Sequence, residues 1–170
     1  MNYEVIDNFL DVETADKLEQ IALAKNIPMF YNDTVSSRDD DPSSGQFYFT
    51  HNLYKDYRIL SEVFGDFTAP VMEKIPSRAL LRAVINYYPR TADTVEHGSH
   101  IDQKFDHTVL LYSVNTNNGF TRLGQKDSDK SVIVESVKNR LIKFDGRTIH
   151  NSATQTDVNL RCNVNFNIIE

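Results

Sequence analysis

The amino-acid sequence predicts a mainly β (α+β) domain, a β-sandwich or jelly-roll barrel with helices packed outside one sheet. Helical periodicity is confined to residues 1–77, whereas residues 78–170 contain a succession of short runs rich in β-branched and aromatic residues. Helices first and many strands afterwards is typical of this class. The strands alternate polar and apolar side chains, so each has one apolar face to bury. Because the chain has no linker or repeat, residues 1–170 are expected to form one domain, with residues 1–77 as a helical lead-in and residues 78–170 as the β-barrel core.

The lead-in is expected to begin with a strand over residues 3–9 and to continue into a helix. Asp11 is a suitable N-cap for this helix, and Thr14 is a competing cap. Apolar side chains then recur at helical spacing, which predicts that one face of the helix packs on the core. These side chains are Ala15, Leu18, Ile21 and Ala22.

The next segment, residues 33–46, is polar and contains proline and glycine, which predicts a loop. Such a loop either closes over a site as a lid or stays solvated. An extended segment is expected at residues 47–54. A second helix is expected near residues 56–75 from its apolar periodicity, which Gly65 and Pro70 interrupt.

The C-terminal part is expected to supply the strands of the barrel. Its runs combine β-branched and aromatic residues and end at turn residues. A further short strand is expected over residues 147–151, after a turn at Asp145-Gly146. The longer runs lie at residues 79–88, 107–115, 130–137, 140–146 and 161–169.

Two of these strands have one mostly polar and one apolar face, because successive side chains of a strand point to opposite sides. The polar faces either line a wet cavity, with the apolar faces against the helices, or point to solvent; alternation alone leaves both open. The polar faces carry Arg82, Val84, Asn86 and Tyr88 on one strand and Arg161, Asn163, Asn165 and Asn167 on the other; the apolar faces carry Leu81, Ala83, Ile85 and Tyr87, and Cys162, Val164, Phe166 and Ile168.

Composition narrows the class of protein. Apolar residues make up 40% of the chain and charged residues 25%, which is ordinary for a soluble globular protein. The net charge of −6 disfavours nucleic acid as a partner. The single cysteine, Cys162, excludes an internal disulfide framework and any cysteine-based metal cage. The N-terminus does not read as a signal peptide and no apolar run approaches a membrane span, so a cytoplasmic protein is expected.

A split set of metal-ligand residues follows the first long strand. His100 and Asp102 are two positions apart, so on an extended chain both side chains leave the same face, and His150 would join them from another strand. Two imidazoles and one carboxylate can take one face of a metal and leave other positions open. Iron, zinc and manganese all suit this set. The other histidines considered are His97, which would face away from His100, and His51 and His107, which are expected to be structural or exposed.

Arg161 lies eleven positions after His150, on the polar face of the last strand. A guanidinium pairs with a carboxylate through two parallel hydrogen bonds, so Arg161 is a candidate anchor for a carboxylate-bearing cosubstrate. The alternative is a surface ion pair with Asp157 or Glu135. Further candidates to bind the same acid are Tyr88 and Asn86, which otherwise simply pack on the sheet, and Thr108.

Several stretches, in their order, resemble the iron(II)- and 2-oxoglutarate-dependent oxygenases of the prolyl 4-hydroxylase-like branch. They are NYYP, HGSHID, TVLLYSVNTNNGFT, NRLIKFDGRTIH and LRCNVNF, spread over residues 80–168, and the opening VIDNFLDVETADKL resembles the helical lead-in of that branch. The chain departs from the family in a longer tract between Tyr88 and His100 and in an arginine where many prolyl hydroxylases use lysine. The family's Gly-Gly-x-Thr hairpin reads Asn118-Gly119-Phe120-Thr121, which still suits a tight turn.

The resemblance implies a double-stranded β-helix in which His100, Asp102 and His150 hold Fe(II). Arg161 would bind the distal carboxylate of 2-oxoglutarate, with help from Tyr88 and Asn86. It also implies that dioxygen and 2-oxoglutarate are consumed to succinate and carbon dioxide while a substrate C–H bond is hydroxylated. The substrate, whether a small molecule, an amino acid or a side chain of a peptide or protein, is left open, as is the oligomeric state.

Two other functions compete with this one. A cupin-like isomerase or ligand-binding protein would use the same triad with zinc or manganese and would not use 2-oxoglutarate; Arg161 and the order of the motifs argue against it. A relative that keeps only a structural role would not need the intact triad.

Overall fold

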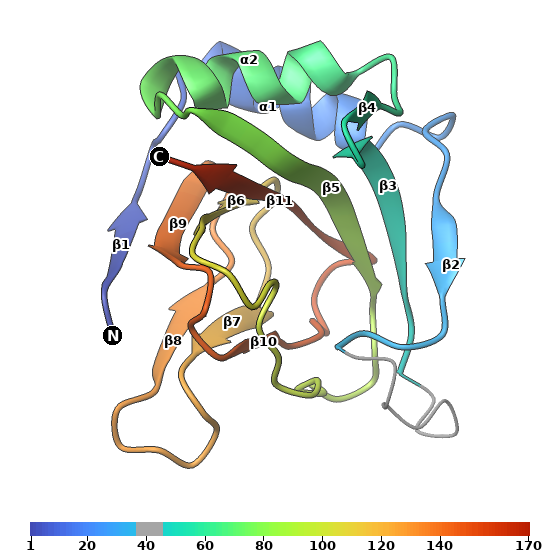
Figure 1. Cartoon of the computed structure of the whole chain (residues 1–170). Helices are drawn as coiled ribbons and strands as arrows, with labels where there is room; N and C mark the ends of the chain where they lie inside the picture. Colours follow the sequence, from blue (N-terminus) through green and yellow to red (C-terminus); the bar gives the residue numbers. More distant parts are fainter. Residues whose placement is uncertain (37–45) are drawn as a thin grey trace.

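The structure is a computed structural model that describes residues 1–36 and 46–170. Within these residues it contains two helices and eleven strands, arranged as a two-sheet jelly roll with the helices outside (Figure 1). Most of the loop expected at residues 33–46 lies outside the described residues. The elements are β1 Tyr3–Ile6, α1 Val12–Ala22, β2 Phe30–Asn32, β3 Tyr48–Lys55, β4 Arg58–Ile59, α2 Phe64–Lys74, β5 Ala79–Pro89, β6 Thr108–Ser113, β7 Phe120–Leu123, β8 Val132–Glu135, β9 Arg140–Asp145, β10 His150–Ser152 and β11 Leu160–Ile169.

The two sheets are antiparallel and differ in size. The large sheet runs β1-β9-β6-β11-β5-β3-β2, with β4 paired to β3, and the small sheet runs β10-β7-β8. Both helices lie over the β5 end of the large sheet in Figure 1. The expected mainly β jelly roll with helices on one sheet is therefore confirmed. The hairpin expected at Asn118-Gly119 is wrong, because β6 lies in the large sheet and β7 in the small one, so this turn crosses between sheets.

The helices differ in how closely they follow the prediction. The side chain of Asp11 caps α1, accepting a hydrogen bond from the backbone N of Thr14 at 2.9 Å, as expected. The helix expected over residues 56–75 is shorter, because its first part folds as a hairpin in which β4 pairs with the end of β3. No helix in the described part of the chain is both long enough and apolar enough to cross a bilayer.

The central strand β11 separates a dry core from a polar interior. Its apolar face packs with the helices in one core cluster. Its polar face, Arg161 to Asn167, is also buried, with each of the four side chains at most 7% exposed. The alternative in which the polar faces point to solvent is therefore wrong. The apolar side chains of the core include Leu18, Phe67 and Val71 from the helices and Cys162, Val164, Phe166 and Ile168 from β11.

Strand β5 repeats this arrangement with one irregularity. Ala83, Ile85 and Tyr87 lie in the core, as expected. The register between β11 and β5 shifts after Asn167, so Leu80 and not Leu81 pairs with Ile168 and packs on the core. A β-bulge of this kind turns the side chains beyond it to new directions. Leu81 thus leaves the apolar face to which alternation assigned it.

Candidate metal centre and cosubstrate cavity

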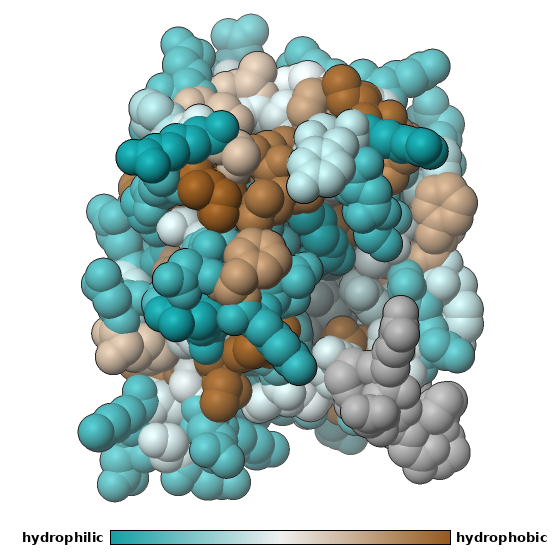
Figure 2. Space-filling model, viewed as in Figure 1, coloured by the Kyte–Doolittle hydropathy of each residue, from teal (hydrophilic) through white to brown (hydrophobic). Residues whose placement is uncertain are grey.

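A cavity of about 60 Å³ lies between the two sheets and is called the inter-sheet cavity below. Its walls come from β3, β5, β10 and β11 and from the segment that carries His100 and Asp102. Figure 2 shows the molecule hollowed on the face of this view, with hydrophilic side chains around the opening. The polar faces of β5 and β11 supply much of its lining, including Asn86, Asn163 and Asn165.

The structure brings His100, Asp102 and His150 together in this cavity. One ligand atom from each lies within 4.8 Å of the others, and this is the one such cluster found among the described residues. Asp102 Oδ1 lies 3.6 Å from His100 Nε2 and 3.5 Å from His150 Nε2. Donors at right angles around a metal with bonds of about 2.0–2.1 Å would be about 3 Å apart, so little movement is needed to bind one.

The backbone and the neighbouring side chains hold these ligands in place. His100 and His150 form an isolated β-bridge with reciprocal backbone hydrogen bonds of 2.9 Å. His150 Nδ1 lies 2.9 Å from the carbonyl oxygen of Thr148, to which it can only donate, and this leaves Nε2 as the ligand atom. Asp102 Oδ2 accepts hydrogen bonds from the side-chain amides of Asn165 at 3.0 Å and Asn167 at 2.7 Å. The other carboxylate oxygen, Oδ1, therefore faces the two imidazoles.

Electrostatics favour the protonation states that bind metal. Burial by itself would raise the pKa of Asp102, but His150 and the two asparagine amides outweigh it and hold the pKa well below its usual range. Burial, followed by the nearby His150, lowers the pKa of His100. The site thus offers a carboxylate and at least one neutral imidazole at neutral pH.

Arg161 is buried behind Tyr88 and Thr121, two residues that line the inter-sheet cavity, and has no anionic partner among the described residues. It is 1% exposed, and it donates hydrogen bonds from Nε to Ser136 Oγ at 2.8 Å and from Nη2 to Thr121 Oγ1 at 2.9 Å. Its third nitrogen, Nη1, is buried and has no hydrogen-bond partner among the described residues. The proposed ion pair with Asp157 does not form, since Asp157 accepts from the backbone N of Asn118. Burying an unpaired guanidinium is costly, so the geometry favours a carboxylate ligand.

The wall around Arg161 is rigid and closely packed. The Arg161 guanidinium carbon lies 5.0 Å from the centre of the Tyr88 ring, which stacks between Tyr48 and His97 at 5.6 and 5.5 Å. A Cβ on Gly119 would lie 2.8 Å from Arg161 Cδ and 3.0 Å from the Ala153 carbonyl oxygen, so only glycine leaves room for the arginine. Asn86 donates from its side chain to Asn163 at 3.0 Å. Tyr88 and Asn86 therefore line the same cavity as the triad.

Thr108 is not brought to the cavity. On β6, Thr108 shares a face with Leu110 and Tyr112, which belong to the core beneath the helices. Leu111, on the other face, lines the cavity. Its hydroxyl instead donates to Glu170 at 3.0 Å. Thr108 was expected with the cosubstrate residues, and the alternation along its strand places it on the opposite face.

The other histidines have structural roles. His97 contacts Ser152 Oγ through Nδ1 at 2.8 Å and stacks on Tyr88. His51 contacts the Pro28 carbonyl oxygen and Ser61 Oγ. His107 contacts the Phe105 carbonyl oxygen and fills the space beside Gly146, where a Cβ would lie 2.1 Å from its ring.

Sequence reasoning missed three residues that shape the site. Tyr48 lies in a segment expected only to be extended, and Thr121 and Ser136 lie on or beside short strands of the small sheet. Burial, and then the nearby Tyr88, raise the pKa of Tyr48 to about 12, so its phenol keeps its proton. Of the three, only Thr121 could have been found from the sequence, because it ends the Asn118-Gly119-Phe120-Thr121 stretch that corresponds to the Gly-Gly-x-Thr pattern.

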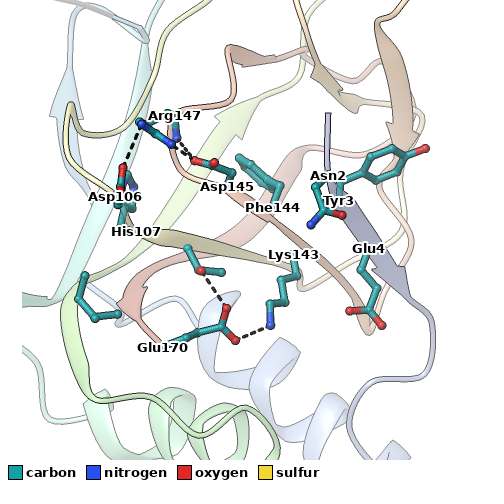
Figure 3. Close-up of a pocket in the computed structure, with 12 residues that line it drawn as sticks. Asn2, Tyr3, Glu4, Asp106, His107, Lys143, Phe144, Asp145, Arg147 and Glu170 are labelled. Atoms are coloured by element: carbon teal, nitrogen blue, oxygen red, sulfur yellow. Dashed lines mark hydrogen bonds and ion pairs between the residues drawn. The ribbon is translucent and has the colours of Figure 1, made fainter.

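A larger hollow, about 580 Å³, lies between the two chain ends and is called the terminal cleft below (Figure 3). It is lined by Asn2, Tyr3, Glu4, Asp106, His107, Thr108, Lys143, Phe144, Asp145, Arg147, Ile169 and Glu170. Five of its six charged side chains pair with one another: Lys143 with Glu170, and Arg147 with Asp106 at 3.0 Å and Asp145 at 3.7 Å. No triad residue lines it.

Comparison with known proteins gives structural similarity alone. No family model matches the sequence, and neither does any curated protein. Among solved structures, the chain is similar to a Pseudomonas putida prolyl-4-hydroxylase, with a TM-score of 0.72, 10% identity, and 99% of this chain and 92% of that chain covered. The chain therefore shares its fold with this protein.

Two further structures share this fold. One is a prolyl hydroxylase from Trichoplax adhaerens in complex with a peptide fragment of the hypoxia inducible factor oxygen degradation domain, with a TM-score of 0.71, 15% identity, and 98% and 83% of the two chains covered. The other is the epimerase SnoN in complex with Fe3+, alpha ketoglutarate and nogalamycin RO, with a TM-score of 0.70, 11% identity, and 99% and 78% covered. The fold therefore carries more than one reaction, and the reaction must be argued from the site.

Proposed function

We propose that this protein is an Fe(II)- and 2-oxoglutarate-dependent oxygenase, working as one domain over residues 1–170 in the cytoplasm, that hydroxylates a C–H bond of its substrate. His100, Asp102 and His150 would hold the iron, and Arg161 would bind the distal carboxylate of 2-oxoglutarate. The observation that carries the proposal is Arg161 Nη1, a buried charged group with no partner among the described residues, in the wall beside an intact ligand triad.

The residues present fit both groups. The three ligand atoms lie within 4.8 Å of one another, so one metal could take all three, and a metal with six positions would keep three for a chelating 2-oxo acid and dioxygen. When bound, iron and 2-oxoglutarate would supply the oxidising chemistry: 2-oxoglutarate is split to succinate and carbon dioxide, one oxygen atom of dioxygen ends in succinate, and the other ends in the hydroxyl group on the substrate. The protein's own part is to orient the ligands, to hold the dicarboxylate and to exclude water.

Each of these tasks has a residue. Asn165 and Asn167 fix one oxygen of Asp102, so that the other is aimed at the metal position. Thr121 and Ser136 hold two nitrogens of Arg161 and so aim the third. Tyr88 closes one side of the arginine, and Asn86 is positioned through Asn163 to donate to the bound acid.

The cupin-like alternative explains the triad but not Arg161. A metal-dependent isomerase or ligand binder that ignores 2-oxoglutarate would leave a fully buried guanidinium without an anion. The chain is also similar to an epimerase whose structure contains iron and alpha ketoglutarate. That similarity bears on which reaction the substrate undergoes, and it is compatible with 2-oxoglutarate as the cosubstrate.

The test is calorimetric titration of 2-oxoglutarate into the anaerobic Fe(II)-loaded protein, followed by a succinate assay in air. Arg161→Ala should weaken 2-oxoglutarate binding by on the order of a hundredfold or more, since a buried charge pair is lost. Its Fe(II) affinity should change by less than about twofold, because the arginine is not a metal ligand. The matched control is Arg147→Ala, an arginine of the terminal cleft, which should bind like the wild type. Metal binding without any 2-oxoglutarate binding in the wild type would favour the cupin-like alternative.

A further inference from the structure

A second arginine, Arg82, lines the inter-sheet cavity itself and, like Arg161, has no anionic partner among the described residues. It is partly exposed and makes no hydrogen bond or ion pair with any of the described residues. It lines the inter-sheet cavity, and it also lines a shallower hollow of about 210 Å³, called the mouth hollow below. Arg82 is the residue common to the two. The mouth hollow is lined by Lys55, Asp56, Tyr57, Leu81, Arg82, Gln103, Phe105 and Asn167.

Arg82 lies at the opposite end of the metal centre from Arg161. On β5 and β11 the paired positions are Tyr88 with Arg161 at one end and Arg82 with Asn167 at the other. Six residues of strand span about 20 Å, at about 3.3 Å per residue. The carboxylate of Asp102 is held near the Arg82 end by Asn165 and Asn167. The metal position is therefore flanked by two cations, one deep in the barrel and one at its mouth.

This separation gives the two arginines different tasks. A dicarboxylate that reaches from Arg161 to the metal extends away from Arg82, so it cannot occupy both. Arg82 lines the same inter-sheet cavity as His100 and Asp102. The guanidinium is thus close to the metal position but on the side from which a second molecule enters.

Two exposed aromatic side chains, Tyr57 and Phe105, lie among the mostly polar and charged residues that line the mouth hollow. Tyr57 is 90% exposed and Phe105 is 51% exposed. Tyr57 also has a φ of 61°, in the two-residue turn between β3 and β4, where asparagine or glycine is normal. A bulky residue in the left-handed region is unusual, and here the turn imposes it, since the neighbouring Asp56 also has a positive φ of 51°.

We propose that the primary substrate is a small organic acid, whose carboxylate pairs with Arg82 while its apolar or aromatic body lies against Tyr57 and Phe105. This inference rests on the proposed function for its chemistry, but the binding site stands on its own geometry. A small acid is favoured because the cavity and the mouth hollow are both small. A guanidinium prefers a carboxylate because two parallel hydrogen bonds form between them.

The experiment uses two matched pairs of probes: 3-phenylpropanoate with 3-phenylpropanamide, and hexanoate with hexanamide. Each is titrated into Zn(II)-loaded protein with saturating 2-oxoglutarate and followed by ligand-observed NMR, so that no turnover occurs. The acids should bind at least about tenfold more tightly than the amides, because a charge-assisted pair is formed. Arg82→Gln should remove this preference and leave 2-oxoglutarate affinity within about twofold of the wild type.

A second variant separates the aromatic contact from folding. Tyr57→Gly relieves the left-handed backbone, so its thermal midpoint should not fall below that of the wild type. It should weaken 3-phenylpropanoate several-fold while leaving hexanoate less affected. The control is Arg147→Gln, which should retain the wild-type preference for acids.

Three outcomes overturn the inference. Equal binding of acids and amides would exclude a cation that recognises carboxylate. Absence of saturable binding for both acids would exclude a small-acid site. A loss of 2-oxoglutarate affinity in Arg82→Gln as large as that in Arg161→Ala would make Arg82 part of the cosubstrate site. If acids bind through Arg82 but the wild type fails to bind 2-oxoglutarate, then the proposed function fails and the small-acid site remains.

Discussion

The inter-sheet cavity and the terminal cleft differ in whether their charged side chains are paired with opposite charges. The terminal cleft is the larger, about 580 Å³ against about 60 Å³, and its surface carries ion pairs between Lys143 and Glu170 and around Arg147. The inter-sheet cavity has one partly exposed arginine in its lining, Arg82, and a fully buried one, Arg161, packed behind the lining residues Tyr88 and Thr121; neither has an anionic partner among the described residues. The pairing of the charged side chains around a hollow is therefore a better indicator of a ligand-binding site than the volume of the hollow.

The energetics explain the difference. Exposed ion pairs contribute little and need no further partner. A buried guanidinium cannot lose its proton to escape the cost of burial, so it needs an anion. One nitrogen at the terminal cleft, His107 Nε2, also lacks a partner. An imidazole can be neutral, however, and this one fills the space beside Gly146, so its unpaired nitrogen does not indicate a missing anion.

The largest effect, a loss of metal affinity, is expected when one carboxylate of the inter-sheet cavity is replaced by alanine, and it is compared with the same replacement in the terminal cleft. Asp102→Ala removes a metal ligand and leaves two buried amides without an acceptor, so metal affinity should fall by more than about a hundredfold. Asp106→Ala removes an exposed carboxylate of the terminal cleft and should leave metal affinity unchanged. Titration of Mn(II) into both variants, monitored by electron paramagnetic resonance, measures this. Similar Mn(II) affinities for the two variants would abolish the distinction between the regions.

A smaller effect, on 2-oxoglutarate affinity, is expected from a substitution at Gly119, whose backbone lies against Arg161. Gly119→Ala places a methyl group 2.8 Å from Arg161 Cδ, so the side chain must move away from its present position. We expect 2-oxoglutarate affinity to fall by on the order of tenfold, with metal affinity retained, because the guanidinium is misplaced but present. Calorimetry of the metal-loaded variant measures both. Gly65→Ala is the matched control, since nothing lies within 4 Å of its added methyl group. An unchanged affinity in Gly119→Ala would mean that Arg161 is not held where the acid binds.

The sequence predicts much of this site because the relevant signals are local. Alternation along β11 identifies Arg161 and the three asparagines as one face, and the spacing of His100 and Asp102 identifies them as neighbours. Alternation does not tell which face is buried, since a strand has the same period in either orientation. That decision needs the pairing of β11 between β5 and β6, which only the three-dimensional structure provides.

The features that were missed depend on contacts between distant residues. Gly119 and Arg161 are far apart in the chain, and nothing in either segment indicates that they touch. The bulge after Asn167 moves Leu81 off the core face, and no glycine near Leu81 in the sequence indicates this bulge. The turn at Asp56-Tyr57 lacks the usual glycine as well, so the hairpin was predicted as part of a helix. Short strands such as β2 and β4 are too brief to show a period.

The smallest effect is expected from the ion pair of the terminal cleft. Lys143 hydrogen-bonds Glu170 and thereby lowers the pKa of that carboxyl group. A carboxyl whose pKa is lower in the folded state stabilises the fold above its unfolded value, about 4.3, and loses this contribution as the pH falls through the folded value. Both side chains are partly exposed, so the pair should contribute no more than about 1 kcal/mol.

A double-mutant cycle with Lys143→Met and Glu170→Gln, measured by urea unfolding at about pH 7 and about pH 3, gives this coupling free energy directly. It should be small at the higher pH and absent at the lower one, and 2-oxoglutarate affinity should be unchanged throughout. Glu170→Gln keeps an acceptor for the Thr108 hydroxyl, so the cycle isolates the charge. A coupling above about 2 kcal/mol, or any loss of 2-oxoglutarate binding, would mean that paired charges at the chain ends do matter to the site. The contrast between neutralised and unpaired charges would then no longer separate the two regions.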